Sequence, residues 1–132
     1  MATNGAFSDY LEEAIINHFL RGQAQIAPSK VYIGLFETDA GEDGSGTETT
    51  YTGYERQESE WGAPSGGKTV NDAVITFPQN QDAQPVTISH IALFDAQTGG
   101  NQLFRAQLLS ARTLEQGDSL AFDAGAVELQ VD

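Results

Sequence analysis

The stretch "ISHIALFDAQTGGNQLFRAQL", residues 88–108, decides the fold, because its pattern predicts two antiparallel strands joined by a tight turn. Gly99 and Gly100 lie in the turn, and glycine readily adopts the positive φ that short hairpin turns require. The first strand is apolar on both faces, although a strand of a two-layer sandwich needs only one apolar face. Simple alternation assigns its side chains to two sets, Ile91 with Leu93 on one face and Ile88 with Ala92 and Phe94 on the other.

The second face of this strand needs a cover, because a large apolar surface is rarely left in water. An N-terminal helix lying across the sheet is one candidate. A symmetry-related subunit or the shell of a larger assembly is the other. The residues alone leave both open.

The N-terminal stretch "FSDYLEEAIINHFLRG" predicts a helix over residues 7–21. Ser8 is suited to cap its first turn, and Gly22 is suited to end it in a left-handed conformation. Apolar side chains recur at spacings of three and four residues and form one stripe: Phe7, Leu11, Ala14, Ile15, His18 and Phe19. Such a stripe indicates packing on the core of the protein or docking onto a neighbouring subunit.

Residues 29–131 carry strand patterns without interleaved helices. Strands are expected in "KVYIGLF", "AVITF", "PVTISHIALFD", "NQLFRAQLL" and "SLAFDAGAVELQV". Gly34, inside the first of them, indicates that another backbone or a bulky ring comes close. The pattern predicts a mainly β chain, an antiparallel β-sandwich of the jelly-roll or immunoglobulin-like kind with one N-terminal α-helix. A chain of 132 residues fits a single domain, residues 1–132.

Two segments, residues 37–53 and 61–72, are rich in glycine, serine, threonine and acidic residues. Their low apolar content predicts long exposed loops, because burial cannot offset the entropy of ordering them. Binding residues are often found on such loops.

The charge balance excludes several classes of partner. Six basic and nineteen acidic residues give a formal net charge of −13, which repels nucleic-acid phosphates and anionic lipid surfaces. No apolar run approaches the roughly 20 residues that span a bilayer. We therefore expect neither a nucleic-acid partner nor a membrane partner.

The sequence contains no motif that selects residues for catalysis or metal binding. In the acidic loop, Gly41 and Thr50 stand where a calcium loop needs side-chain oxygens. The two histidines, His18 and His90, have no metal-binding spacing and are expected to be structural. There is no cysteine and no nucleophile elbow, and nothing selects a pair of carboxylates for glycosidase chemistry. We expect no catalytic residue, no cofactor and no metal, and therefore not an enzyme.

The stretch "YERQESEWG" combines large aromatic side chains with an arginine, which are the residue types that dominate interface hot spots. The alternative interpretation of this stretch is a core or edge strand that leads into the glycine-rich segment. Together with the helix stripe and the second face of the hairpin, it gives the candidate interface residues Phe7, Leu11, Ile15, Phe19, Tyr54, Arg56, Trp61, Ile91 and Leu93.

The order of these motifs resembles a family of small virion proteins of tailed bacteriophages, often labelled tail-fibre proteins and similar to capsid decoration or cement proteins. The resemblance covers residues 7–129, and its sharpest motifs are "HIALFDAQTGGNQLF" and "GDSLAF". It implies a structural protein of the virus particle, folded mainly as β-sheet and present in many copies, with no catalysis. It does not settle whether the protein belongs to the head or the tail.

The function expected from these observations is capsid decoration. The protein would bind the outer surface of the head, with the major capsid protein or another virion protein as its partner, and would stabilise the lattice. A homo-oligomer is expected, with a trimer favoured. The alternative is a tail-fibre or adsorption protein, in which residues 37–53 and 61–72 would bind a host-surface glycan.

Overall fold

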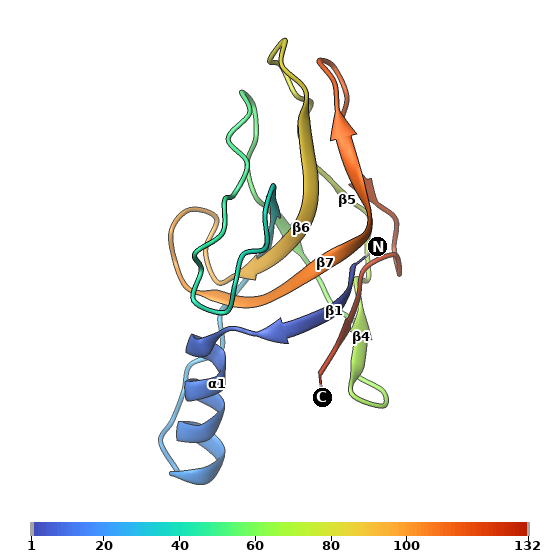
Figure 1. Ribbon diagram of the computed structural model, residues 1–132. Helices are drawn as coiled ribbons and strands as arrows, with labels where there is room; N and C mark the ends of the chain where they lie inside the picture. The colour runs from blue at the N-terminus through green and yellow to red at the C-terminus, as the bar shows by residue number, and fades with distance from the viewer. Residues whose placement is uncertain (1, 132) are drawn as a thin grey trace.

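The computed structural model describes residues 2–131, with side chains described from residue 5 onward. Within that range the chain forms β-strands and one helical segment (Figure 1). The helical segment consists of α1, Asp9–Ile15, and a π-helical turn η1, Ile16–Leu20, which follows it directly. The strands are β1 (Ala2–Phe7), β2 (Val31–Phe36), β3 (Gln57–Ser59), β4 (Lys68–Val70), β5 (Ile75–Thr76), β6 (Val86–Phe94), β7 (Gln102–Leu114), β8 (Ala121–Phe122) and β9 (Glu128–Gln130).

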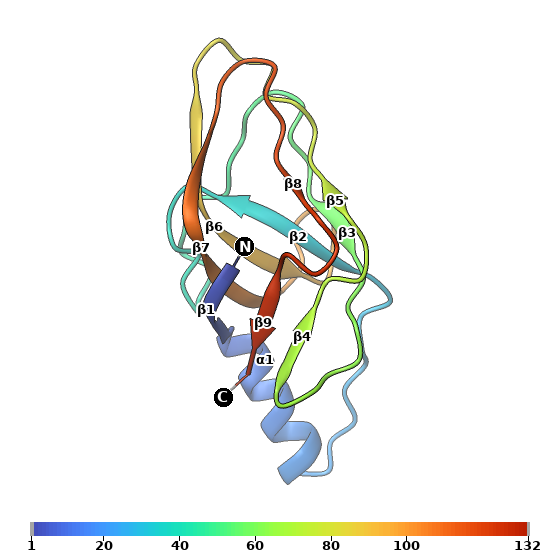
Figure 2. The same ribbon diagram turned by 90° about the vertical axis from the view of Figure 1, so that its right-hand side faces the viewer.

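The strands form two layers. The larger layer is an antiparallel sheet in the order β1-β7-β6-β2-β3, and the hairpin of β6 and β7 lies in its interior. Two short ladders, β4 with β9 and β5 with β8, lie opposite this sheet (Figure 2). The arrangement confirms the mainly β, sandwich-like fold with one N-terminal helix that the sequence predicts.

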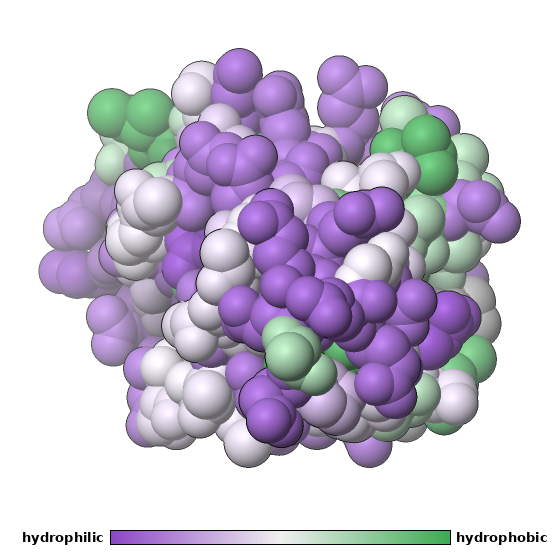
Figure 3. Space-filling model, turned by 90° about the horizontal axis from the view of Figure 1, so that it is seen from above, coloured by the Kyte–Doolittle hydropathy of each residue, from purple (hydrophilic) through white to green (hydrophobic). Residues whose placement is uncertain are grey.

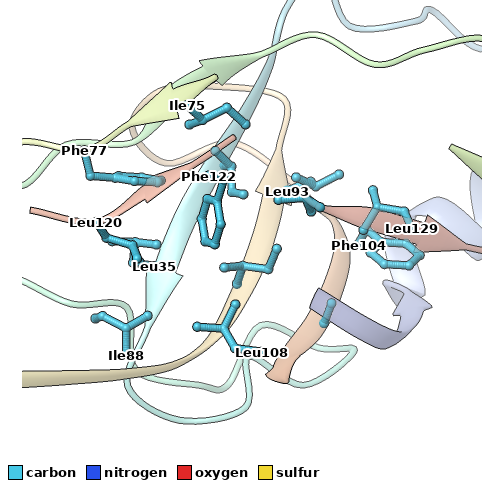
Figure 4. Close-up of a cluster of buried hydrophobic side chains, with 14 of the residues drawn as sticks. Leu35, Ile75, Phe77, Ile88, Leu93, Phe104, Leu108, Leu120, Phe122 and Leu129 are labelled. Atoms are coloured by element: carbon cyan, nitrogen blue, oxygen red, sulfur yellow. The ribbon is translucent and has the colours of Figure 1, made fainter. Parts of the chain in front are cut away.

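The main hydrophobic core lies between the two layers (Figure 4). The sheet contributes side chains such as Leu35 and Ile91. The opposite layer contributes Phe77 and Phe122, whose rings meet edge to face with centroids 6.2 Å apart. Because burying one such side chain stabilises a fold by about 1.5–3 kcal/mol, contact between the layers supplies most of the driving force for this fold.

An irregularity in the hairpin changes which side chains share a face. The pairing of β6 with β7 shifts register just after Ile88. The shift turns Ile88 onto the same face as Ile91 and Leu93, and all three lie in the main core. The predicted grouping of Ile88 with Ala92 and Phe94 is therefore wrong.

The second face of β6 is covered by the chain between β2 and β3. Ala92 and Phe94 pack there with Phe36 and Ala40, and the rings of Phe36 and Phe94 stack with centroids 6.0 Å apart. Arg56 closes this cluster, because its guanidinium carbon lies 3.5 Å from the centroid of the Phe94 ring. The N-terminal helix extends away from the sheet instead (Figure 1), so the prediction that it covers this face is wrong.

Residues 37–53 are more ordered than their composition predicts. Ala40, Thr49 and Tyr51 are buried. The N–H of Thr49 donates to the carbonyl of Leu35 at 2.9 Å, which ties the segment to β2. The expected exposed loop is thus a folded excursion with an exposed tip at residues 42–45.

Two other segments also differ from the expected pattern. Residues 61–72 contain β4, which pairs with β9 after a turn in which Gly66 and Gly67 have φ of 60° and 76°. The expected single strand over residues 119–131 is divided into β8 and β9.

The helix begins two residues later than predicted. Phe7 is the last residue of β1, an edge strand that pairs with β7. Ser8 caps the helix, since its hydroxyl accepts a hydrogen bond from the N–H of Leu11 at 3.1 Å. Gly22 follows the helical segment with φ of 69°, the left-handed conformation expected at its end.

Candidate functional site

Residues 8–30 form an arm that extends from one edge of the sheet (Figures 1 and 2). One limb of the arm is α1 with η1. The other limb is the return segment, residues 21–30, which runs back beside the helix toward β2. The rest of the chain is the body from which the arm projects.

Hydrogen bonds fix the base of the arm. The N–H of Ser8 donates to the carbonyl of Leu103 at 3.0 Å, and the Ser8 hydroxyl donates to the carbonyl of Gln102. The N–H of Asp9 donates to the carbonyl of Glu42 at 2.9 Å. Because Ser8 is also buried, the helix leaves the sheet in a defined direction.

The arm carries most of the large hydrophobic side chains that the described chain exposes. Its α1 and η1 elements contain no buried residue. A concentration of exposed apolar side chains on one element of a folded protein marks a binding surface. Five of the eight such side chains in the described range lie on the arm: Tyr10 (44% exposed), Ile16 (49%), Phe19 (75%), Leu20 (79%) and Ile26 (95%).

An open groove of about 630 Å³ lies between the two limbs. Leu11, Ile15 and Phe19 line it on the helix side, and Ile26 lines it on the side of the return segment. Leu103 of β7 also contributes to its lining. The groove is therefore suited to receive apolar side chains of another protein segment.

The helix is apolar on more than one side. Leu11, Ile15 and Phe19 line the groove, whereas Ile16 and Leu20 are exposed and do not line it. Exposed apolar side chains on two sides of a helix give it two surfaces that another molecule can cover. The arm is therefore suited to pack against more than one surface of another molecule.

The structure brings three of the predicted interface residues together on the arm, namely Leu11, Ile15 and Phe19. Phe7 lies just before the arm, where its ring packs edge to face on Phe104 with centroids 5.9 Å apart.

Sequence reasoning missed four residues of the arm. The spacing of Ile16 and Leu20, four residues apart, was a signal for the second apolar side. Tyr10 and the isolated Ile26 carried no comparable signal. All four are exposed, so the apolar surface of the arm is wider than the predicted stripe.

Two of the predicted interface residues belong to the core instead. Ile91 and Leu93 are 1% and 6% exposed and lie between the two layers, so their assignment to an interface is wrong. Trp61 is half-buried against the main core, and its Nε1–H donates to the hydroxyl of Ser59 at 3.0 Å. Its position just after β3 matches the alternative reading of this stretch as an edge strand.

Arg56 is also internal. Its Nε and Nη2 donate to the two carboxylate oxygens of Glu48 at 2.9 and 2.8 Å. Its Nη1 donates to the carbonyls of Ala96 and Gly99 at 3.0 and 2.8 Å. Since Arg56 is 8% exposed and its donors are engaged within the chain, the prediction that it contacts a partner is wrong.

Tyr54 completes a buried polar cluster with Glu48 and Arg56. Its hydroxyl donates to the Glu48 carboxylate at 2.6 Å and accepts from the N–H of Leu35 at 3.0 Å. Burial, together with the hydrogen bond to Glu48, raises the pKa of Tyr54, so the hydroxyl keeps its proton. The cluster joins residues 48–56 to β2 and to the turn of the central hairpin.

Gly34 lies against this cluster. A Cβ at position 34 would lie 2.8 Å from a carboxylate oxygen of Glu48 and 3.1 Å from the Tyr54 hydroxyl. This confirms the close approach that the sequence predicts at Gly34, with side chains rather than a backbone as the neighbour.

Replacing Gly34 with alanine is expected to lower the free energy of unfolding by about 1–3 kcal/mol, because the added methyl group displaces the Glu48 carboxylate from its partners. Gly62→Ala is the control, since its Cβ would meet a carboxylate oxygen of the exposed Asp72 at 3.1 Å. Thermal unfolding followed by circular dichroism compares the two variants. Equal melting temperatures would show that Glu48 and Tyr54 can shift to make room for the methyl group without loss of stability.

Two aspartates of the acidic loop, Asp39 and Asp43, are engaged within the protein. Asp39 pairs with Arg105 at 3.0 Å. Asp43 accepts a hydrogen bond from the N–H of Ser45 at 3.0 Å, and hydrogen bonding to Ser45 lowers the pKa of Asp43. Among residues 2–131, no group of three or more histidine, cysteine, aspartate or glutamate side chains is placed to hold a metal ion. In the same range no helix is long and apolar enough to cross a membrane.

The fold and the arm together define the class, a small β-sandwich-like module with a protruding apolar helical arm. The family model described as "Podophage GP4 fiber I protein gp80" matches residues 6–130, so the chain belongs to this family. A search of curated proteins found no match.

Membership of this family makes the protein a structural protein of a bacteriophage particle. The predicted resemblance to virion proteins of tailed phages is confirmed.

Proposed function

We propose that the protein is a structural subunit of the fibre apparatus on the phage tail and that it is incorporated into the particle through its arm. The observation that carries this proposal is the concentration of exposed apolar side chains on residues 8–30. The family description, which names a fibre protein, supports the tail over the head.

The body of the protein is suited to remain in solvent when the arm is bound. The end of the molecule opposite the arm is mainly hydrophilic (Figure 3). A net charge of −13 keeps neighbouring particles from adhering to one another. The role is structural and includes no chemical step.

Capsid decoration, the function favoured by the sequence, is the second candidate. A small acidic body with a short attachment arm also suits a protein that binds in many copies to the outside of the major-capsid lattice, where repetition supplies avidity. In that case the major capsid protein would be the partner of the arm.

Adsorption to a host-surface glycan has less support. Residues 37–53 lie partly packed on the sheet, and Glu48 binds Tyr54 and Arg56 rather than facing solvent. Residues 61–72 are partly engaged in the pairing of β4 with β9. Both segments are thus partly engaged within the chain.

The location is tested by quantitative mass spectrometry of purified particles. A tail subunit is expected at a copy number far below that of the major capsid protein, and separated tails should retain it. A copy number comparable to that of the major capsid protein, with the protein on separated heads, would replace the fibre proposal by capsid decoration.

The role of the arm is tested by the double variant Phe19→Ser with Leu20→Ser. Large apolar anchors contribute about 2 kcal/mol or more each to an interface, so incorporation into particles should fall by more than about tenfold. Both side chains are exposed, and therefore the melting temperature should stay close to that of the parent. Particles from a phage that lacks the gene, complemented with each variant, are compared by immunoblot.

The matched control is Val74→Ser with Leu109→Ser, which removes two similarly exposed side chains from the body. Normal incorporation of the control and loss of the arm variant would support the proposal. Equal incorporation of both variants would contradict it.

A further inference from the structure

The partner that fills the groove of the arm has to satisfy three features of the described chain. It has to match the size of the arm, cover two apolar sides of the helix and tolerate the charge of the body. Each feature limits the choice.

We propose that the partner is the arm of a second copy of this chain, and that the two arms pair with their helices antiparallel about a twofold axis near Ile15. The second copy would be the first partner of the arm, and this inference rests on the proposed role of the arm in assembly of the particle. The dimer would then be the unit that enters the particle.

The size of the arm fits a self-complementary interface. A specific interface buries about 800 Å² on each partner and uses about 20–30 residues a side. The arm comprises residues 8–30, which is 23 residues, and its return segment is exposed along its whole length. Two arms together therefore supply one interface of ordinary size.

One partner arm covers both apolar sides of the helix, because each arm has two limbs. In a twofold pair, the helix of one copy enters the groove of the other and contacts Leu11, Ile15 and Phe19. The partner's return segment then lies against the side that carries Ile16 and Leu20. A lone helix from another protein would cover only one of these sides.

The charge layout favours the antiparallel orientation. Asp9, Glu12 and Glu13 lie at the base of the helix, whereas Arg21 lies at its tip. Antiparallel pairing brings the tip of each helix to the acidic base of the other. Parallel pairing would bring acidic base against acidic base.

The same orientation separates the two acidic bodies. The helical stretch at residues 9–20 has a length of about 18 Å at the rise of an α-helix. That length exceeds the Debye length of about 8 Å at physiological salt, so repulsion between the bodies is largely screened. The sequence favours a trimer, and a trimer with parallel arms would place three chains, each of net charge −13, side by side.

The oligomeric state is measured on the purified full chain by light scattering coupled to gel filtration over a concentration series. The expected mass is twice that of the chain, and Phe19→Ser with Leu20→Ser should give the mass of one chain. Val74→Ser with Leu109→Ser should remain a dimer. A trimeric or monomeric parent would overturn the proposal.

The orientation is measured by disulfide trapping, since the chain contains no cysteine and each variant then carries a single thiol. Ile15→Cys should form a disulfide-linked dimer, because the axis passes near it. Leu11→Cys and Phe19→Cys should each remain unlinked alone and should link when mixed. Position 11 and position 19 are about 12 Å apart along a helix, which exceeds the reach of a disulfide.

A body variant, Leu109→Cys, is the control and should stay unlinked. Self-linkage of Leu11→Cys or Phe19→Cys alone would indicate parallel helices and overturn the proposal. A monomeric parent that still enters particles would overturn the dimer and leave the virion role intact. A parent that dimerises through the arm but is absent from particles would support the dimer and overturn the virion role.

Discussion

Replacing Arg56 with methionine is expected to destabilise the protein by about 3 kcal/mol, at the lower end of the range of about 3–5 kcal/mol for breaking a buried ion pair. The side chain of Arg56 is 9% exposed and that of Glu48 is 24% exposed, so the Glu48 carboxylate keeps some contact with water. The substitution removes both hydrogen bonds that Arg56 donates to the Glu48 carboxylate. It also removes the hydrogen bonds that Arg56 donates to the carbonyls of Ala96 and Gly99. Methionine retains the apolar contact with the Phe94 ring.

Two further variants separate the effect of losing the Arg56–Glu48 ion pair from the effect of losing the other contacts of Arg56. Lys68→Met removes an exposed pair with Glu128, whose atoms are 3.7 Å apart, and should cost less than about 1 kcal/mol. Adding Glu48→Gln to Arg56→Met should recover part of the loss, because no uncompensated charge is then buried.

Urea unfolding of the four proteins gives the free energies, provided that the slope of each transition is unchanged. A loss for Arg56→Met no larger than that for Lys68→Met would contradict the structural role of the cluster. Failure of the double variant to recover stability would assign the loss to the freed carbonyls of Ala96 and Gly99 and to the lost cation–π contact with Phe94, rather than to the charge of Glu48.

The central hairpin could be predicted from the sequence because its signals are local. The two glycines of its turn have φ of 61° and 71°, as the turn chemistry requires. The register shift in β6 could not be predicted in the same way. It depends on how β7 pairs across the sheet, because the partner residue on β7 passes from Arg112 to Gln107 between Ile88 and His90 of β6. Such an irregularity changes which side chains share a face.

The acidic segment shows a second limit of composition. Its low apolar content predicts a long exposed loop, because a composition rule counts only burial. In the structure the segment is held by backbone pairing with β2 and by the ion pair between Glu48 and Arg56. These partners are eight residues apart, and no periodic pattern links them.

The candidate site was predictable only where periodicity applies. Leu11, Ile15 and Phe19 follow a helical spacing, so the sequence identified one apolar side of the arm. Ile91 and Leu93 are apolar residue types that also occur in interfaces. They belong to the core because the opposite layer packs on them, and the sequence does not show that contact. Whether an apolar stripe is buried inside the protein or offered to a partner depends on tertiary placement.

Replacing Phe77 with alanine is expected to cost about 3–5 kcal/mol, which is the range for removing a fully buried aromatic ring. Phe77 is 1% exposed and lies in the main core near Phe122 (Figure 4). It packs edge to face on Phe122 with centroids 6.2 Å apart and stacks on Tyr54 with centroids 6.4 Å apart. One ring therefore connects the second layer to the polar cluster above the sheet.

The control for this variant is Val74→Ala, a truncation three residues away at a site that is 60% exposed, which should change the free energy of unfolding by less than about 0.5 kcal/mol. Domains of this kind have a total stability of about 5–15 kcal/mol, so loss of the Phe77 ring should lower the urea midpoint markedly. Phe77 does not line the groove of the arm, so the proposed pairing of arms should persist in the molecules that stay folded. A loss below about 1 kcal/mol would mean that the second layer is held chiefly by its hydrogen bonds, such as that from the Phe77 N–H to the carbonyl of Leu120, and not by this ring.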